Sequence, residues 1–237
     1  MKACEMSDHE IRASKDKIKH VLIPIGSLEQ HGGHLPISTD SIIIESIANA
    51  VAEKIPLLVL PTIPYGISFE HKPFFNISLF STTISSAISE ICLSLYEYEL
   101  PKIIILNGHH GNKGILQYIS QSVEKSLLQK SNIYTINYWQ LLDRDFDHAG
   151  FVETSLMLAI RPDLVKMTKA TKGSVASTIL PAVTSSFLNT PSSFIKITKT
   201  GVLGDPMRAS TKQGKKLLNH LTKNIIAAIH QFNDLSA

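Results

Sequence analysis

GSLEQHGGHLPISTD, from Gly26 to Asp40, is the stretch around which this chain of 237 residues is organised. It contains Glu29, His31, His34 and Asp40 together with three glycines. Neither a core segment nor a surface helix needs this combination of carboxylates, imidazoles and glycines. The stretch is therefore the first candidate for a functional site.

Apolar segments flank this stretch on both sides. HVLIPIG, from His20 to Gly26, is a short β-branched run typical of a buried strand. The apolar positions of Ser41 to Lys54 recur at helical spacing, and Pro56 ends that predicted helix. A strand that leads through a polar, glycine-containing loop into a helix is where α/β proteins place their chemistry.

The rest of the chain continues this alternation. Further strands are predicted at Leu57 to Pro61, Lys102 to Asn107 and Asn132 to Trp139, with another expected within Lys172 to Val183. Helices are predicted at Ser81 to Tyr98, Lys113 to Lys130, Val152 to Ala159 and Arg208 to Phe232, and long loops at Thr62 to Phe80 and Ser185 to Thr200. The pattern predicts one α/β domain, residues 1–237, with a central, mostly parallel sheet flanked by helices on both faces.

The composition argues against several classes of function. Hydrophobic residues make up 43% of the chain, enough for a buried core. The net charge is +3 without a basic tract, so we expect no nucleic-acid partner. No apolar run reaches membrane-spanning length, and the N-terminus does not resemble a secretory leader. Two cysteines without metal or disulfide spacing favour a reduced, cytoplasmic protein.

Three polar clusters each follow a predicted strand. They are Glu29, His31, His34 and Asp40 after the first strand, His109, His110 and Asn112 after Lys102 to Asn107, and Asp147, His148 and Glu153 after Asn132 to Trp139. Loops that follow parallel strands emerge at one edge of the sheet, so these side chains are expected to meet.

The residue types of these clusters suit zinc, manganese or iron. Glu29 and His31 are two positions apart, so on an extended segment they point to the same side. Asp40 begins the predicted helix, where each carboxylate oxygen can face a different cation. His109 lies in a glycine-flanked turn that allows close backbone approach. Four such ligands, one of them bridging, predict a centre with two divalent metal ions.

Each motif taken alone also has a structural interpretation. NGHHGN is compatible with a tight turn, and HAGFVETS with a helix start that places Glu153 near the positive end of the dipole. Glu70 and His71 are compatible with a solvated loop pair. The clusters together are harder to explain structurally, because burying so many ionisable groups is costly unless a cation compensates.

At this point the sequence resembles the creatininase-like amidohydrolases. GSLEQHGGHLPISTD resembles the family pattern GSxEQHGPHLPLxTD, YGISFEH resembles YGxSxEH, NGHHGN resembles NGHGGN, and HAGFVETS resembles HAGExETS. The four motifs occur in the same order. The resemblance implies an α/β fold with a dinuclear metal site at the carboxyl edge of the sheet, and a homo-oligomer, often a hexamer built as a trimer of dimers.

The resemblance also implies roles for individual residues. Glu29, His31, Asp40 and His109 match the family's metal ligands, with Asp40 as the bridge. Glu153 matches a glutamate at the metal centre, as ligand or general base, and His148 matches a histidine that handles the substrate or its proton. Around the substrate the expected residues are Tyr65, Glu70, His71 and His110.

The chain departs from the family pattern at several positions. Gly33 replaces a proline, His110 replaces a glycine, and FFNI stands where the family has FPGT. Creatininase itself has a metal-binding glutamate at the position of Gly111, so Glu153 is the expected source of a compensating ligand.

The expected activity is metal-dependent hydrolysis of a non-peptide or small amide C–N bond. Among family activities, the deformylase of a formylamino-pyrimidine ribosyl phosphate in flavin and deazaflavin biosynthesis is favoured. The alternatives are a creatinine amidohydrolase and a peptidase of a short modified peptide, such as the mycofactocin peptidase. An alternative of another class is a catalytically inactive scaffold protein that retains the fold and its metal-binding residues.

Overall fold

The centre of the fold is a parallel sheet of four strands. The computed structural model describes residues 1–100, 102–143, 147–173 and 198–235. In spatial order the strands are β3 (Leu57–Val59), β1 (His20–Ile25), β5 (Lys102–Asn107) and β6 (Asn132–Asn137). Ile25 pairs with Asn107, which pairs with Asn137, so β1, β5 and β6 end level with one another. The predicted parallel sheet is confirmed.

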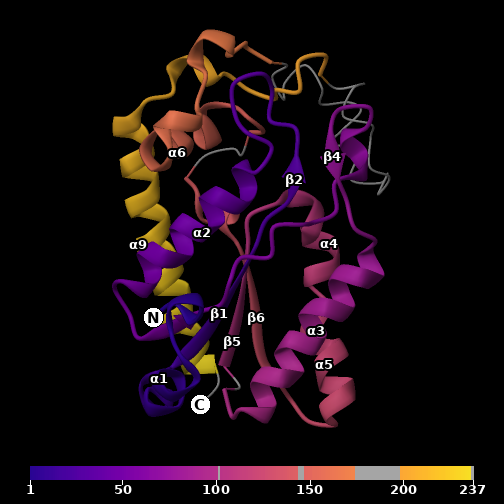
Figure 1. Ribbon diagram of the computed structural model, residues 1–237, viewed down its shortest axis with the longest axis vertical. Helices are drawn as coiled ribbons and strands as arrows, with labels where there is room; N and C mark the ends of the chain where they lie inside the picture. The colour runs from indigo at the N-terminus through magenta and orange to yellow at the C-terminus, as the bar shows by residue number, and fades with distance from the viewer. Residues whose placement is uncertain (101, 144–146, 174–197, 236–237) are drawn as a thin grey trace.

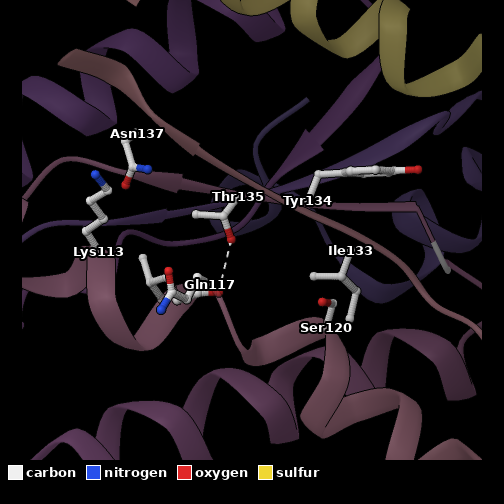
Figure 2. A pocket seen from close by; sticks show the side chains of 8 residues that line it. Lys113, Gln117, Ser120, Ile133, Tyr134, Thr135 and Asn137 are labelled. Carbon is white, nitrogen blue, oxygen red and sulfur yellow. Dashed lines mark hydrogen bonds between the residues drawn. The ribbon is translucent and has the colours of Figure 1, made fainter. Parts of the chain in front are cut away.

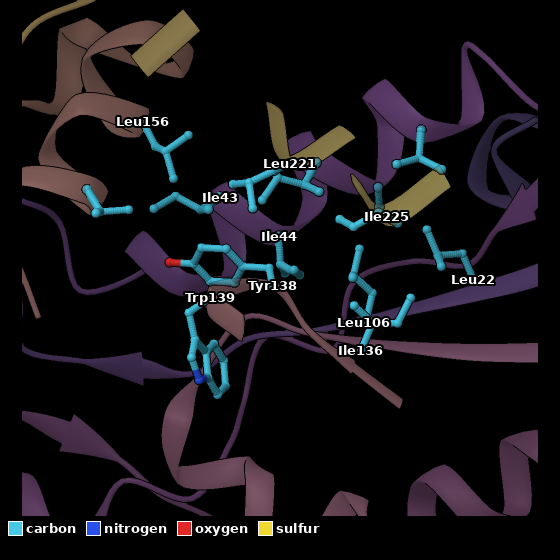
Figure 3. Packing of buried hydrophobic residues seen from close by; sticks show 14 of the residues in the cluster. Leu22, Ile43, Ile44, Leu106, Ile136, Tyr138, Trp139, Leu156, Leu221 and Ile225 are labelled. Atoms are coloured by element: carbon cyan, nitrogen blue, oxygen red, sulfur yellow. The ribbon is translucent and has the colours of Figure 1, made fainter. Parts of the chain in front are cut away.

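Alternation along the strands explains why helices cover both faces. Leu22 and Leu106 point into one apolar cluster, whereas Ile23 and Ile105 point into the other. The first face is covered by α2 (Thr39–Ala52), α6 (Phe151–Ile160) and α9 (Thr211–Leu235). The second face is covered by α3 (Ser81–Glu97), α4 (Lys113–Leu116) and α5 (Ile119–Leu127) (Figure 1). Figure 3 shows the first cluster, in which Ile43, Leu156 and Leu221 from three helices meet.

Two predicted elements have different bounds in the structure. The helix expected over Lys113 to Lys130 is two shorter helices, α4 and α5, which meet at the exposed Tyr118. The strand expected to reach Trp139 ends at Asn137, because the chain turns into a 3-10 helix, Tyr138–Leu141, that buries Tyr138 and Trp139 in the first cluster.

The predicted loop Thr62 to Phe80 is tied to the Gly26 to Asp40 stretch. It contains a 3-10 turn, Phe69–His71, and β4 (Asn76–Ile77), which pairs antiparallel with β2 (Leu28–Glu29). This second sheet lies beyond the carboxyl end of β1 (Figure 1). The loop is thereby held over the edge of the sheet where the polar clusters were expected.

Two further predictions cannot be compared with the fold. The strand within Lys172 to Val183 and the loop Ser185 to Thr200 fall mainly on residues 174–197, which lie outside the described residues. Within the described part of the chain, none of the helices combines the length and apolar character that a membrane span requires.

Candidate metal centre

The carboxyl ends of β1 and β5 bring the first two polar clusters together. Asp40 lies in the first turn of α2, and His109 follows β5 after Gly108. A Cβ added to Gly108 would lie 2.7 Å from Ile44 Cβ and 3.0 Å from the Asp40 carbonyl oxygen. Glycine at this position therefore lets the His109 loop lie directly against the start of α2.

Asp40 lies between two histidines. Its Oδ1 is 3.1 Å from His31 Nε2, and its Oδ2 is 3.0 Å from His109 Nδ1. The two oxygens thus face different imidazoles, which is the arrangement expected of a bridging carboxylate.

Two glutamates complete the group around these histidines. Glu29 Oε2 lies 3.3 Å from His109 Nε2, and Glu153 Oε2 lies 3.5 Å from His31 Nε2. Glu153 is in the first turn of α6, and the backbone N–H of Ala149 donates to its Oε2 at 2.5 Å. The third polar cluster therefore contributes to the same centre.

Backbone carbonyls fix the ring orientation of both histidines. His109 Nε2 lies 2.7 Å from the Ile67 carbonyl oxygen, and His31 Nδ1 lies 3.1 Å from the Glu29 carbonyl oxygen. Since a carbonyl oxygen only accepts, each of these nitrogens carries the hydrogen. In the neutral ring that metal binding requires, the opposite nitrogen of each histidine would direct its lone pair at Asp40, as in histidines that bind metals.

The centre is almost completely buried. Exposed fractions are 1% for Glu29, 1% for His31, 2% for Asp40, 4% for His109 and 1% for Glu153. Among the described residues, no hydrogen-bond partner of good geometry reaches Glu29 Oε1, His31 Nε2 or Asp40 Oδ2. Buried charged atoms are costly without a partner, and carboxylate and imidazole donors suit divalent cations such as zinc or manganese. The donor set therefore fits a metal centre.

The pKa values of these groups follow from burial and crowding. Burial raises the pKa of Glu29 to about 8. Burial opposes protonation of His109, yet the charges of Glu29 and Asp40 raise its pKa to about 10. Without a cation, the carboxylates thus favour keeping protons in the centre. A bound divalent ion would take the place of those protons, as metal binding to such ligands generally does.

His148 and His71 border the same centre. His148 Nε2 lies 3.0 Å from the Gln30 carbonyl oxygen, and its Nδ1 lies 3.8 Å from Glu29 Oε1. The His148 ring lies against that of His31, with centroids 4.3 Å apart. His71 is only 3% exposed, and its Nε2 lies 3.2 Å from Glu29 Oε1. The alternative that His71 belongs to a solvated loop pair is therefore wrong.

The other three residues predicted around the substrate lie further out. Tyr65 is 40% exposed, and Glu70 is half-buried beside Gly111. His110 is exposed and packs against Trp139, with ring centroids 5.5 Å apart. Their contact with a substrate stays a prediction.

Several polar residues of the three clusters hold the loops in place. His34 Nε2 lies 2.9 Å from Thr154 Oγ1, and the Asp147 carboxylate accepts from the backbone N–H of Val152 at the start of α6. The Asn112 amide donates to the Gly26 carbonyl oxygen and accepts from the Ile67 N–H. These contacts tie the loops after β1, β5 and β6 to their neighbours.

Gln30 belongs to the centre although the alternation of an extended segment does not predict it. Its Nε2 lies 3.1 Å from both His71 Nδ1 and His148 Nε2. An extended chain would point Gln30 away from its neighbours Glu29 and His31. Gly32, with φ of 65°, turns the chain directly afterwards. The only sequence signal was its position within the ligand-rich stretch.

The position of Gly111 cannot hold a side chain in this backbone. An added Cβ would overlap with the Ile67 carbonyl oxygen and lie 2.5 Å from His109 Nε2. The space that a glutamate would need is therefore occupied. Glu153, reaching the centre from α6, supplies the additional carboxylate.

A surface pocket lies elsewhere, along β6 and the helices α4 and α5 (Figure 2). Its lining includes Lys113, Gln117, Thr135 and Asn137, and Thr135 Oγ1 donates to the Leu116 carbonyl oxygen. None of its lining residues belongs to the buried centre.

Comparisons with known proteins identify the family and agree with the fold. The family model described as creatininase, creatinine amidohydrolase, matches residues 4–229. The creatinine amidohydrolase of Pseudomonas putida is 25% identical over 239 residues, covering 89% of this chain and 88% of that protein. The mycofactocin precursor peptide peptidase of Mycolicibacterium smegmatis is 30% identical over 209 residues, covering 83% and 78%. The structure of a mutant creatininase complexed with creatine superposes with a TM-score of 0.86 at 24% identity, covering 98% of both chains.

Proposed function

Because this chain belongs to the creatininase family, we propose that it is a metal-dependent hydrolase of an amide carbon–nitrogen bond. The observation that carries the proposal is the buried centre itself. Glu29, His31 and Asp40 each direct into it a buried atom that no well-aligned hydrogen bond satisfies. A scaffold protein without a reaction has no need to retain such costly groups.

The donors divide into two overlapping sets that share Asp40. Asp40 Oδ2 and His109, through its Nδ1, would hold one divalent cation together with Glu29, and His31, Asp40 Oδ1 and Glu153 would hold a second. Two such cations would lower the pKa of a water toward ~7 and polarise a carbonyl oxygen. The identity of the metal, zinc, manganese or iron(II), depends on supply as much as on these ligands.

We assign proton transfer in this reaction to His148. Gln30 holds its Nε2, so its Nδ1 faces the centre. As the water oxygen joins the carbonyl carbon, Nδ1 accepts a water proton, and it returns that proton to the leaving nitrogen when the C–N bond breaks. Glu153 acts as a ligand in this scheme, because Ala149 and His31 already engage its Oε2.

The substrate is an amide for which three classes compete. The relatives favour a small cyclic amide such as creatinine or an amide of a short peptide. The formyl group of a formylamino-pyrimidine is the third class, and its hydrolysis uses the same chemistry at the carbonyl carbon. We also propose that the protein is a homo-oligomer of the cytoplasm, and size measurement in solution and localisation in cells test these two points.

The test is a substrate panel on protein freed of metal and then reconstituted with zinc, manganese or iron(II). Creatinine, N-formyl amines and short peptides represent the three classes, and Asp40→Ala is the control. We expect turnover of at least one class that depends on the added metal and is lost in the control. Full turnover by metal-free protein, or by the Asp40→Ala variant, would refute the proposal. Bound metal without any turnover would favour the scaffold.

A further inference from the structure

His34 is a buried histidine whose side chain takes no part in the proposed reaction. The residue is 1% exposed, and its Nε2 lies 2.9 Å from Thr154 Oγ1 in the first turn of α6. Thr154 is completely buried as well. A hydroxyl can both donate and accept, so this hydrogen bond forms with the ring hydrogen on either nitrogen of His34. The bond therefore links the loop after β1 to the start of α6.

The same two segments carry two of the proposed ligands. His31 lies three residues before His34, and Glu153 directly precedes Thr154. His31 Nε2 and Glu153 Oε2 are 3.5 Å apart. The distance between these two donors thus depends on how closely the loop and the first turn of α6 approach each other, which the bond between His34 and Thr154 controls.

The other proposed set of donors does not use α6. Glu29 is in β2, Asp40 is in the first turn of α2, and His109 follows β5. A small shift of α6 away from the loop would therefore disturb the site of the cation held with His31. The site of the cation held with His109 would keep its geometry.

Further contacts keep α6 in the fold when the side chain of His34 is changed. The backbone carbonyl oxygen of His34 accepts from the Lys166 N–H at 2.9 Å, and no side-chain substitution removes this contact. Leu156 and Met157 bury α6 in the first apolar cluster. Loss of the bond to Thr154 should consequently displace the first turn of α6 without unfolding the protein.

We infer that His34 is a positioning residue for one of the two cations: its hydrogen bond to Thr154 sets the spacing of His31 and Glu153. The inference rests on the proposed metal centre, in which both are ligands. The bond holds its two atoms 2.9 Å apart. Apolar groups in contact lie about 3.5–4.0 Å apart, so without the bond the two segments would separate by up to about 1 Å. Contacts that hold ligands in place typically contribute about 10- to 100-fold to metal affinity or activity.

Zinc content at a buffered free-zinc concentration tests this role. At a concentration that just fills both sites of the wild type, His34→Leu and Thr154→Val should hold one ion per chain. Raising free zinc by about 10- to 100-fold should restore the second ion. His34→Gln and Thr154→Ser keep a polar atom at the end of the side chain, so both should hold two ions.

Ser155→Ala is the matched control. Ser155 is the next residue of α6 and is also completely buried, but its hydroxyl has no hydrogen-bond partner among the described residues. This variant should hold two ions. Two ions in His34→Leu at the lower zinc concentration, or loss of both ions, would overturn the inference. Fewer than two ions in the wild type would instead refute the two-cation centre of the proposed function, and the inference with it.

Unfolding of the metal-free protein in urea gives a readout that needs neither metal nor activity. Thr154→Val leaves the His34 nitrogen buried without this partner, so the urea midpoint should fall. Replacing both partners by apolar groups is close to neutral. The double variant His34→Leu/Thr154→Val should therefore regain stability and still hold one zinc ion at the lower concentration.

Two results from the double variant would overturn the inference. Additive losses of stability would show that the two side chains do not interact. Recovery of both the stability and the second zinc ion would show that filling the space, and not the hydrogen bond, places Glu153.

Discussion

Asp40 Oδ2 lies 3.0 Å from His109 Nδ1, and this contact joins the start of α2 to the loop after β5. The proposed ligands therefore include residues of α2 and α6, which cover the same face of the sheet, and of the loop after β5. A cation bound there would link α2, α6 and β5 in the folded state, where these donors converge. Metal binding is consequently expected to stabilise the fold as well as to support the reaction.

Adding metal should raise the melting temperature of the chelated protein. A ligand at about 100 times its dissociation constant stabilises the native state by about 2.7 kcal/mol. For a chain of this size, 1 kcal/mol shifts the melting temperature by about 2–4 °C, so the expected rise is about 5–10 °C. Thermal unfolding with zinc or manganese, reversed by a chelator, measures this effect.

Asp40→Asn is the test of where the stabilising metal binds, since an amide cannot bridge two cations. This variant should show little or no shift, whereas Glu45→Gln, at an exposed position of the same helix, should shift like the wild type. An equal rise in Asp40→Asn would mean that the metal binds elsewhere.

Gly108→Ala should move the His109 loop away from Asp40 at the start of α2. The new Cβ would lie 2.7 Å from Ile44 Cβ, so the His109 loop has to move away from α2. Overpacking of this kind costs about 1–3 kcal/mol, and displacing a ligand by about 1 Å can lower turnover about a hundredfold. Unfolding in urea and steady-state kinetics measure both effects.

Gly114→Ala is the matched control for this substitution. The added Cβ meets no other atom within 4 Å in α4. This variant should be neutral or up to about 1 kcal/mol more stable, because alanine loses less backbone entropy on folding. Equal stability and equal turnover of the two variants would show that the close packing at Gly108 is not needed for either property.

The sheet and most of the centre could be predicted from local patterns. The continuous apolar run of β1 predicted a strand buried on both faces, and β1 is buried at all of its positions. Asp40 was expected to begin a helix and to face two cations, and its two oxygens do face two different histidines. These features follow from the periodicity of the apolar residues and from parallel strands that end at the same edge of the sheet.

Other features depend on long-range packing that the sequence does not express. The strands lie in the order β3-β1-β5-β6. The helical pattern of the connecting segments is compatible with several strand orders, so it does not predict this one. The burial of His71 depends on the pairing of β4 with β2, two strands of two residues each, which is too short to be seen in the pattern. The inward position of Gln30 departs from the alternation of an extended segment, next to the turn at Gly32.

The two cysteines should react at very different rates. Cys4 is exposed, whereas Cys92 is completely buried in α3, and burial raises the pKa of its thiol to about 12. Because the thiolate is the reactive form, an aromatic disulfide reagent at pH 8 should label one thiol per native chain. The second thiol should react only in denaturant, and Cys4→Ser should remove the rapid phase. Two rapid thiols in native protein would contradict the packing of α3.

Glu153→Gln tests whether the carboxylate from α6 replaces the one that Gly111 cannot supply. Glu153 Oε2 lies 3.5 Å from His31 Nε2, and the Ala149 N–H orients it. The variant keeps the size of the side chain but loses its charge. The cation held with His31 should then bind much more weakly, so the metal content should fall by about one ion per chain. If that ion supplies about 4 kcal/mol to the reaction, turnover should fall about a thousandfold.

Asp147→Asn is the matched control for Glu153→Gln. Its carboxylate is in the same segment, but it accepts from the Val152 N–H at the start of α6 and does not face His31. Asparagine keeps an oxygen that can accept from this N–H, so this variant should retain its metal and lose at most about 1 kcal/mol of stability. Elemental analysis of both proteins after equal dialysis gives the comparison. Full metal content in Glu153→Gln would contradict the role of Glu153 as a ligand.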